Sequence, residues 1–328
     1  LFWYITSIFI LIIILLSTVV INKKGFINRI TDKQLVELFD IAPRLKLKDE
    51  KGVCFDRNDN FCSFGSTKNK KVYLVGDSTI GAFSHLLKDE LIERKYNFVT
   101  LVQSGCYYLP GFNRIQRSNG EINKDCSNDF HTKIRSLLNK DEGNIVILGG
   151  NLNLYLNNTF VTKVNESKNW WYKFRSIDSN KDINSTIIES INELLNNNVN
   201  VILLYPIPEL DFDLQKKLFL KIESFKSKKK ETFFYKYLMD NPITFDVDKY
   251  NERSEKSFKI LDQINHPNLY KIYPKDLLCP NTQIKKCKIY KNKKFLYYDG
   301  LHLGEAGAKI MSSAVMDKVN KISNNTRK

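Results

Sequence analysis

The feature of this sequence that most limits its possible folds is a series of short, continuously apolar runs separated by amphipathic stretches. Apolar runs of this kind are typical of strands buried on both faces, and their alternation with helices predicts a parallel sheet covered on both sides. The expected strands are Lys71–Gly76, Phe98–Gln103, Asn144–Gly149, Asn200–Tyr205 and Leu269–Tyr273. The expected helices are Phe83–Lys95, His131–Asn139, Ser185–Leu195 (with Asn184 as a candidate N-cap) and Gly304–Val319. We therefore expect an α/β fold with its ligand site at the carboxyl ends of the strands.

Segments outside this alternation suggest how the chain is divided. Residues 1–21 are almost wholly apolar, and about 20 such residues suffice for a transmembrane helix. Residues 22–70 form a polar linker, and residues 71–328 form the main domain. Within that domain, residues 211–258 are rich in lysine and aromatic residues and break the pattern, so we expect a helical insertion there.

The apolar N-terminus has a competing interpretation as a secretory signal peptide. Such a peptide requires a basic start and a small-residue cleavage site. This sequence has neither, and it does not begin with Met. We therefore expect the chain to be the C-terminal part of a longer membrane protein, with residues 1–21 as its last transmembrane helix.

The formal net charge of +15 raises the question of an anionic partner. Nucleic acid, anionic lipid and anionic polysaccharide would all suit such a charge. The lysines are scattered along the chain, however, and no RNA-recognition or zinc-finger pattern is present. We interpret the excess as solvated surface lysines and expect no nucleic-acid partner.

The six cysteines bear on the compartment. They form three close pairs, and an even number in close pairs favours disulfides and an oxidising environment. A zinc site is the alternative, but no pair has the gap of about two to four residues that zinc knuckles use. The basic residues Lys23, Lys24 and Arg29 would by themselves point to the cytoplasm. We give the cysteines more weight and place the domain outside the cytoplasm. The expected bonds are Cys54–Cys62, Cys106–Cys126 and Cys279–Cys287.

A candidate nucleophile follows the first strand, in the run Val75-Gly76-Asp77-Ser78-Thr79. A serine at this point lies at the top of the sheet, and the next helix offers backbone N–H groups to a developing oxyanion. Gly-Asp-Ser is also an ordinary turn, so this run alone favours the turn interpretation. We expect Asp77 to fix the loop by hydrogen bonds.

A candidate base precedes the last helix, in the run Tyr298-Asp299-Gly300-Leu301-His302. A serine hydroxyl needs a base to remove its proton, and a carboxylate on the other ring nitrogen orients a histidine for that task. Asp299 and His302 are close enough in the sequence to make this contact locally. The alternative is a capping aspartate beside a surface histidine. The three other histidines, His85, His131 and His266, have no partner pattern, and we take them as surface or helix residues.

Two further strand ends carry candidate oxyanion donors. Gly105 follows the second strand and can present its backbone N–H group. Asn151 follows the third strand and can donate its side-chain amide. Each is individually compatible with a plain turn, but such elements at successive strand ends are unlikely to coincide by chance.

This order of Gly-Asp-Ser, Gly, Gly-x-Asn and Asp-x-x-His resembles the SGNH (GDSL-like) hydrolase superfamily over about residues 71–320. The resemblance implies a flavodoxin-like, three-layer α/β/α sandwich. It makes Ser78 the nucleophile, His302 the base and Asp299 its orienting carboxylate. The oxyanion hole then consists of the Ser78 and Gly105 backbone N–H groups and the Asn151 side chain. Asn151 is followed by Leu-Asn, whereas free-standing esterases have the tighter Gly-x-Asn-Asp.

The wider layout is similar to the SGNH domain at the C-terminus of membrane acyltransferase-3 proteins, which O-acetylate cell-surface polysaccharides. The shared features are a final transmembrane helix, a linker with Lys24-Gly25-Phe26, paired cysteines and Gly-Asp-Ser. The resemblance implies an O-acyltransferase module in the cytoplasmic (inner) membrane, with its catalytic domain in the periplasm. A membrane domain would deliver the acyl donor, and a polysaccharide would accept the acyl group.

Two alternatives remain open at this point. The same site would serve a membrane-anchored carbohydrate or lipid esterase, and a non-catalytic glycan-binding module belongs to a different class. Triad chemistry requires no metal or organic cofactor. Residues 211–258 and Trp170–Tyr172 are candidate walls for the acceptor, although the aromatic cluster also suits simple packing.

Overall fold

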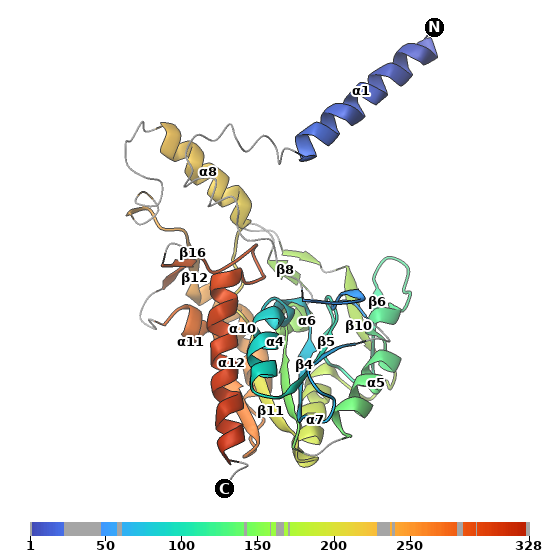
Figure 1. Cartoon of the computed structure of the whole chain (residues 1–328), viewed down its shortest axis with the longest axis vertical. Coiled ribbons are helices and arrows are strands. Elements are labelled where there is room, and N and C mark those ends of the chain that lie inside the picture. Colours follow the sequence, from blue (N-terminus) through green and yellow to red (C-terminus); the bar gives the residue numbers. More distant parts are fainter. Residues whose placement is uncertain are drawn as a thin grey trace.

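The computed structural model consists of one apolar helix followed by an α/β domain (Figure 1). It describes residues 2–22, 47–57, 61–140, 143–157, 159–161, 167–169, 171–227, 237, 240–280, 285–292 and 294–325. The apolar helix is α1 (Phe2–Asn22), and its mean hydropathy of 2.8 makes it long and apolar enough to cross a membrane. The basic flank and the Lys24-Gly25-Phe26 segment lie outside the described residues.

A six-stranded sheet forms the centre of the domain, in the order β13-β11-β7-β4-β5-β3. The first five strands are parallel, and β3 pairs with β5 in the antiparallel sense. The order of the five parallel strands is that of flavodoxin-like sheets, as the sequence led us to expect. The strands are β3 (Cys62–Phe64), β4 (Lys71–Gly76), β5 (Asn97–Val102), β7 (Ile145–Gly149), β11 (Asn200–Leu204) and β13 (Leu269–Ile272).

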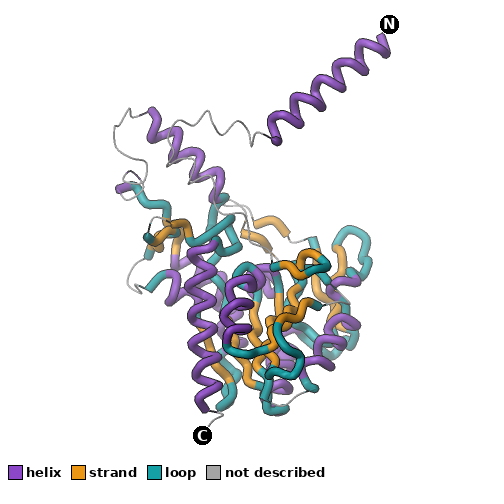
Figure 2. Tube along the Cα trace, in the orientation of Figure 1, coloured by secondary structure: helices purple, strands orange, loops and turns teal. Residues whose placement is uncertain are grey.

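Helices cover both faces of this sheet and produce three layers (Figures 1 and 2). Successive strand residues point to opposite faces, so Val72 and Leu74 belong to one buried cluster and Tyr73 and Val75 to the other. The first cluster includes residues of α4 (Ser84–Glu93) and α12 (Glu305–Asn325). The second includes residues of α5 (Asn128–Leu138), α7 (Ile183–Asn196) and the C-terminal end of α10 (Val247–Leu261).

Shorter elements connect these layers. The short helices are α3 (Ser78–Gly81), the 3₁₀ turn η2 (Lys124–Cys126), α6 (Leu152–Asn157) and α11 (Pro274–Leu278), and a longer one is α8 (Leu214–Ser227). Within the described ranges, five short antiparallel pairs lie outside the main sheet. They are β1 (Lys48–Asp49) with β2 (Gly52–Val53), β6 (Phe112–Gln116) with β10 (Tyr172–Ser176), β8 (Thr159–Val161) with β9 (Ser167–Asn169), β12 (Thr244–Asp246) with β14 (Lys286–Lys288), and β15 (Tyr290–Lys291) with β16 (Lys294–Phe295).

The expected strands and helices are present, with shifted ends. The N-cap of α7 is Asp182 and not Asn184, because the Asp182 carboxylate accepts hydrogen bonds from the backbone N–H groups of Asn184 and Ser185. The last helix continues past Val319 to Asn325, with Ile322 buried against the first cluster.

Two segments take part in the domain more fully than their composition indicates. The expected linker contains β3, an edge strand of the central sheet that Cys62 and Phe64 anchor against β5. The expected insertion at residues 211–258 contains α10, which is the crossover helix between β11 and β13. Its buried residues Ile260 and Leu261 pack on the sheet, so the excursion from the α/β pattern ends before residue 247.

Candidate active site

Ser78 lies at the point where β4 ends and α3 begins. Its neighbour Gly76 has φ +143, and a Cβ atom there would lie 1.9 Å from the carbonyl oxygen of Gly149. No other residue fits so close to the adjacent strand. The chain thus turns sharply after β4 and leaves Ser78 only partly buried.

A chain of hydrogen bonds joins the three expected catalytic residues. Ser78 Oγ lies 2.9 Å from His302 Nε2, and His302 Nδ1 lies 2.8 Å from Asp299 Oδ2. The His302 side chain is 14% exposed, so the ring is sheltered but still open to a small substrate. Residues 224 positions apart thereby meet at one edge of the sheet. This is the arrangement in which a histidine can take a proton from a serine hydroxyl.

The Asp299 loop holds the histidine in place. Asp299 Oδ1 accepts hydrogen bonds from the backbone N–H groups of Leu301 at 2.7 Å and His302 at 2.6 Å. Burial alone would raise the pKa of the Asp299 carboxyl, but hydrogen bonds from His302 and the two backbone groups outweigh burial and lower it. The carboxylate therefore stays ionised and can stabilise an imidazolium.

Asp77 is buried and accepts four hydrogen bonds from the loops around Ser78. Its Oδ1 accepts from the Thr79 backbone N–H at 2.8 Å and the Thr79 hydroxyl at 2.6 Å. Its Oδ2 accepts from the Asn151 backbone N–H at 2.7 Å and the Tyr155 hydroxyl at 2.6 Å. This carboxylate fixes the Ser78 turn against the loop that carries Asn151, which agrees with the loop-fixing role expected for it.

The two further oxyanion candidates follow the strands on either side of β4. Gly76 is in register with Val102 of β5 and with Gly149 of β7, so the loops after those strands flank Ser78. Gly105 has φ +62, a left-handed conformation that favours glycine. Asn151 is 6% exposed, and its side-chain oxygen accepts from the Leu154 backbone N–H. The loops that carry Gly105 and Asn151 therefore lie on either side of the end of β4.

A buried ion pair next to Asn151 has no counterpart in the sequence analysis. Glu209 Oε2 lies 2.7 Å from Arg253 Nε, and the Glu209 side chain is 6% exposed. Burial raises the pKa of Glu209, while the charge of Arg253 and the nearby Asn151 side chain oppose the rise. The Asn151 side chain therefore lies close to the Glu209 carboxylate, whose Oε1 has no hydrogen-bond partner among the described residues. The available signal was a charged residue just after the fourth strand, in Pro206-Ile-Pro-Glu209, at the substrate edge of the sheet.

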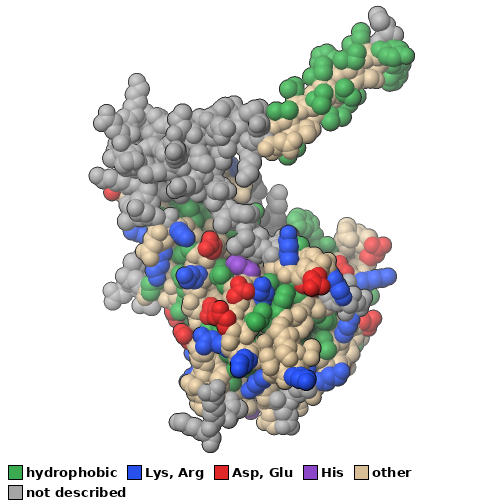
Figure 3. Space-filling model, viewed as in Figure 1, with side chains coloured by type: hydrophobic (Ala, Val, Ile, Leu, Met, Phe, Trp, Pro, Cys, Tyr) green, Lys and Arg blue, Asp and Glu red, His purple; other side chains and the backbone are tan. Residues whose placement is uncertain are grey.

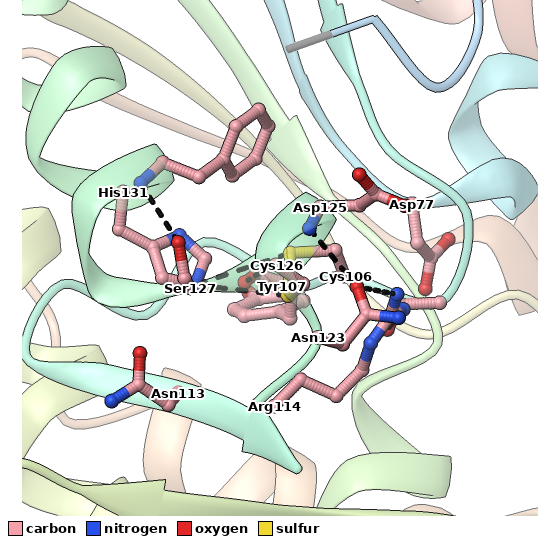
Figure 4. The surroundings of a disulfide bond; sticks show 12 residues. Asp77, Cys106, Tyr107, Asn113, Arg114, Asn123, Asp125, Cys126, Ser127 and His131 are labelled. Carbon is pink, nitrogen blue, oxygen red and sulfur yellow. Dashed lines mark hydrogen bonds between the residues drawn. A yellow bond between two sulfur atoms is a disulfide. The ribbon is translucent and has the colours of Figure 1, made fainter. Parts of the chain in front are cut away.

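The three disulfides have the pairing expected from the sequence. Cys106–Cys126 joins the loop after β5 to the turn before α5 (Figure 4). His131 packs beside this bond, 0% exposed, with Nε2 at 3.9 and 3.8 Å from the two sulfurs, and burial lowers its pKa to about 3. His131 is therefore a neutral core residue of α5 and not a surface one. His131, Cys106 and Cys126 lie close enough together to resemble a metal site. The two sulfurs form a disulfide, however, and only a thiolate is a metal ligand.

The remaining candidate residues are the aromatic cluster and two further histidines. Trp170 is not described, Trp171 is 71% exposed, and the Tyr172 ring packs on Arg114. His85 is on α4, and His266 accepts from the Asn268 backbone N–H in a loop. Lys and Arg side chains are interspersed with Asp and Glu on the face shown in Figure 3. That distribution agrees with scattered, solvated lysines.

The sheet order and the position of the site at the carboxyl edge of β4 define an α/β protein of the SGNH hydrolase type, a class that handles acyl groups. The family model described as "SGNH domain (fused to AT3 domains)" matches residues 47–317. The chain belongs to that family. The match begins at the first described residue of the domain and includes β3, in agreement with the sheet.

Comparisons with other proteins add little beyond the family. No curated protein matches the sequence. Among solved structures, the chain is similar to the periplasmic domain of a lipopolysaccharide acetyltransferase from Salmonella ser. Paratyphi A, with 14% identity, a TM-score of 0.46, and coverage of 77% of this chain and 85% of that one. It is also similar to a putative acylhydrolase from Bacteroides fragilis (12%, 0.38, 79% and 90%) and to an acetyl xylan esterase (15%, 0.38, 76% and 99%). At these values the likenesses carry no argument about activity.

Proposed function

We propose that this domain is an O-acyltransferase module that passes an acyl group, in the first instance acetyl, through Ser78 to a hydroxyl group of a cell-envelope polysaccharide. The observation that carries the proposal is the continuous hydrogen-bonded chain from Ser78 Oγ through His302 to Asp299 Oδ2, at 2.9 and 2.8 Å. Membership of a family whose domains are fused to membrane acyltransferase domains supports transfer over simple hydrolysis.

In the first half-reaction, Ser78 Oγ attacks the acyl carbonyl carbon while His302 takes the hydroxyl proton. The bond between the acyl carbon and the donor's leaving group breaks, and His302 gives its proton to that group. Asp299 keeps the ring oriented and stabilises its positive charge. The Ser78 and Gly105 backbone N–H groups and the Asn151 amide stabilise the oxyanion.

In the second half-reaction, an acceptor hydroxyl attacks the acyl-serine and gives its proton to His302. The acyl–Oγ bond breaks, and the proton returns to Ser78. Water in place of the sugar would make the same site an esterase. Transfer therefore depends on holding a sugar hydroxyl at attack distance, and such positioning is worth many kcal/mol.

The compartment follows from the same proposal. A membrane-spanning α1, three disulfides and the family's fusion partner support a domain on the outer side of the cytoplasmic membrane. The acyl donor would reach Ser78 from a membrane acyltransferase domain. Residues 1–21 and 71–328 would then be the anchor and the catalytic unit, with the catalytic unit extended at its start by β3.

The test measures how the acyl group is partitioned. The full chain in detergent receives an activated acetyl ester, with and without envelope polysaccharide. We expect slow release of acetate alone, and diversion of acetyl onto the glycan when polysaccharide is added. Ser78→Ala should abolish both products, whereas Ser136→Ala, which removes an exposed serine on α5, should change neither. Fast hydrolysis with no acetylated glycan would show an esterase, and no turnover by a folded protein would favour a glycan-binding module.

A further inference from the structure

Arg114 of β6 lies behind the loop that carries Gly105. Its guanidinium is buried, with the residue 5% exposed. One terminal nitrogen, Nη1, donates to the carbonyl oxygens of Ser104 at 2.6 Å and Gly105 at 2.7 Å. The other, Nη2, donates to Asn123 Oδ1 at 2.9 Å, beside the Cys106–Cys126 disulfide (Figure 4). The guanidinium therefore donates short, charge-assisted hydrogen bonds to two successive carbonyl groups of this loop.

The charge of Arg114 is not neutralised by an ion pair. Arg57, Arg135 and Arg253 each hold a carboxylate at 2.7, 2.6 and 2.7 Å. Within the described part of the chain, Arg114 has no such partner, and its open face is covered by the Tyr172 ring at 4.7 Å. Burial lowers the pKa of Arg114, but an arginine remains protonated in a protein. Asp125 and Asp56 are close enough to oppose the effect of burial, but neither carboxylate forms an ion pair with the guanidinium, so its field acts mainly on the carbonyl groups that it contacts.

The nearest groups that this field acts on belong to the Ser104–Gly105 peptide. The C=O of Ser104 and the N–H of Gly105 are in the same planar, trans peptide unit, so they point in opposite directions. A donor held on the oxygen therefore fixes the direction of the N–H group. It also polarises the peptide, because hydrogen bonds in a chain strengthen one another in a medium of low dielectric constant.

The same loop is held from the other side by Asp56. Its carboxylate accepts from the Ser104 backbone N–H at 2.6 Å and from the Ser104 hydroxyl at 3.0 Å. Gly105 adopts its φ of +62 without strain, but glycine is also the most flexible residue, so the loop depends on such contacts to keep a single conformation. Arg114 and Asp56 together leave the Ser104–Gly105 peptide little freedom to flip.

We propose that Arg114 is a positioning residue, which orients and polarises the Ser104–Gly105 peptide so that the Gly105 N–H group stabilises the oxyanion formed when Ser78 attacks. This inference rests on the proposed acyl transfer through Ser78 and assigns a source of transition-state stabilisation to a residue that does not touch the substrate. It predicts that replacing Arg114 lowers kcat and weakens the preference for a carbonyl oxygen over a thiocarbonyl sulfur, while substrate binding stays the same.

The test uses the full chain and two substrates, p-nitrophenyl acetate and its thiono analogue, in which sulfur replaces the carbonyl oxygen. Sulfur accepts hydrogen bonds poorly, so the wild-type protein should prefer the oxygen ester. Arg114→Met should lower kcat for the oxygen ester by about tenfold to a hundredfold, with KM nearly unchanged. The preference for oxygen over sulfur should fall in the same proportion, which a merely structural loss would not produce.

The matched control is Arg117→Met, which removes an exposed arginine next to β6 that donates to the Tyr172 carbonyl oxygen at 3.1 Å. It should leave kcat and the oxygen preference unchanged. Circular dichroism checks folding, and Arg114→Lys carries the test if Arg114→Met does not fold. Lysine keeps the charge but not the planar fork, so its oxygen preference should be intermediate.

Wild-type kcat or a wild-type oxygen preference in the folded Arg114 variants would overturn the proposal, as would a change confined to KM. Failure of the proposed function has a different signature. In that case Ser78→Ala would keep the esterase activity, whatever the Arg114 variants do.

Discussion

At the scale of single residues, the three candidate catalytic residues can be recognised in the sequence, whereas the residues that position the loops around them cannot. Ser78, Asp299 and His302 belong to short motifs, because their spacing is set by one turn and one loop. Arg114 and Glu209 belong to no such motif. Arg114 contacts a loop only 10 residues earlier in the chain, but this contact depends on how the hairpin of β6 and β10 packs, and Glu209 lies beside Asn151 only through tertiary packing. Polar residues next to strand ends can be predicted, but a buried arginine in a flanking hairpin cannot.

The Glu209–Arg253 pair gives a prediction at this scale. Glu209→Gln keeps the size of the side chain but removes the negative charge next to the Asn151 side chain, which would orient the Asn151 amide. If Asn151 is an oxyanion donor, kcat should fall by about tenfold, because a poorly aimed donor loses part of its effect. In an Asn151→Ala background the same substitution should cost nothing further. A double-mutant cycle on kcat measures this coupling, and equal losses in both backgrounds would contradict it.

At the scale of elements, the apolar runs predicted the five parallel strands because a strand buried on both faces needs apolar side chains throughout. The segments that differed are those whose burial depends on partners. β3 is short and polar on one side, and it becomes a strand only by pairing with β5. α10 has a charged outer face, so its sequence does not show that it belongs to the α/β pattern. That becomes clear only from the packing of its last turn on the sheet.

The disulfides give a prediction for the elements they connect. Cys106→Ala/Cys126→Ala removes a bond spanning 20 residues and should lower the free energy of unfolding by about 3 kcal/mol. It should also lower kcat, because this bond braces the loop that carries Gly105. Urea unfolding and turnover of the same preparations measure the two effects.

The control is Cys279→Ala/Cys287→Ala, which removes a bond spanning 8 residues near α11 and β14. It should lower the free energy of unfolding by about 2 to 3 kcal/mol and leave kcat close to that of the wild type. Equal losses of kcat in both double variants would show that general stability, and not the Gly105 loop, limits turnover.

At the scale of the whole molecule, an apolar helix, a disulfide-bonded α/β domain and membership of a family fused to membrane acyltransferase domains all support one account. In that account an acyl group reaches Ser78 from the membrane and leaves on a polysaccharide. The sheet brings Ser78 and His302, from opposite ends of the domain, together at the carboxyl edge of β4, as this account requires.

The most direct measurement of the central claim is to trap the acyl-enzyme. The full chain is mixed with an activated acetyl ester without acceptor, quenched in acid and digested, and its peptides are weighed by mass spectrometry. The account predicts one acetyl group on the peptide containing Ser78 in the wild type and in Ser136→Ala, its loss in Ser78→Ala, and its disappearance when polysaccharide is added before the quench. Turnover by the Ser78→Ala variant, or acetyl groups distributed over lysines and other serines with none enriched at Ser78, would contradict it.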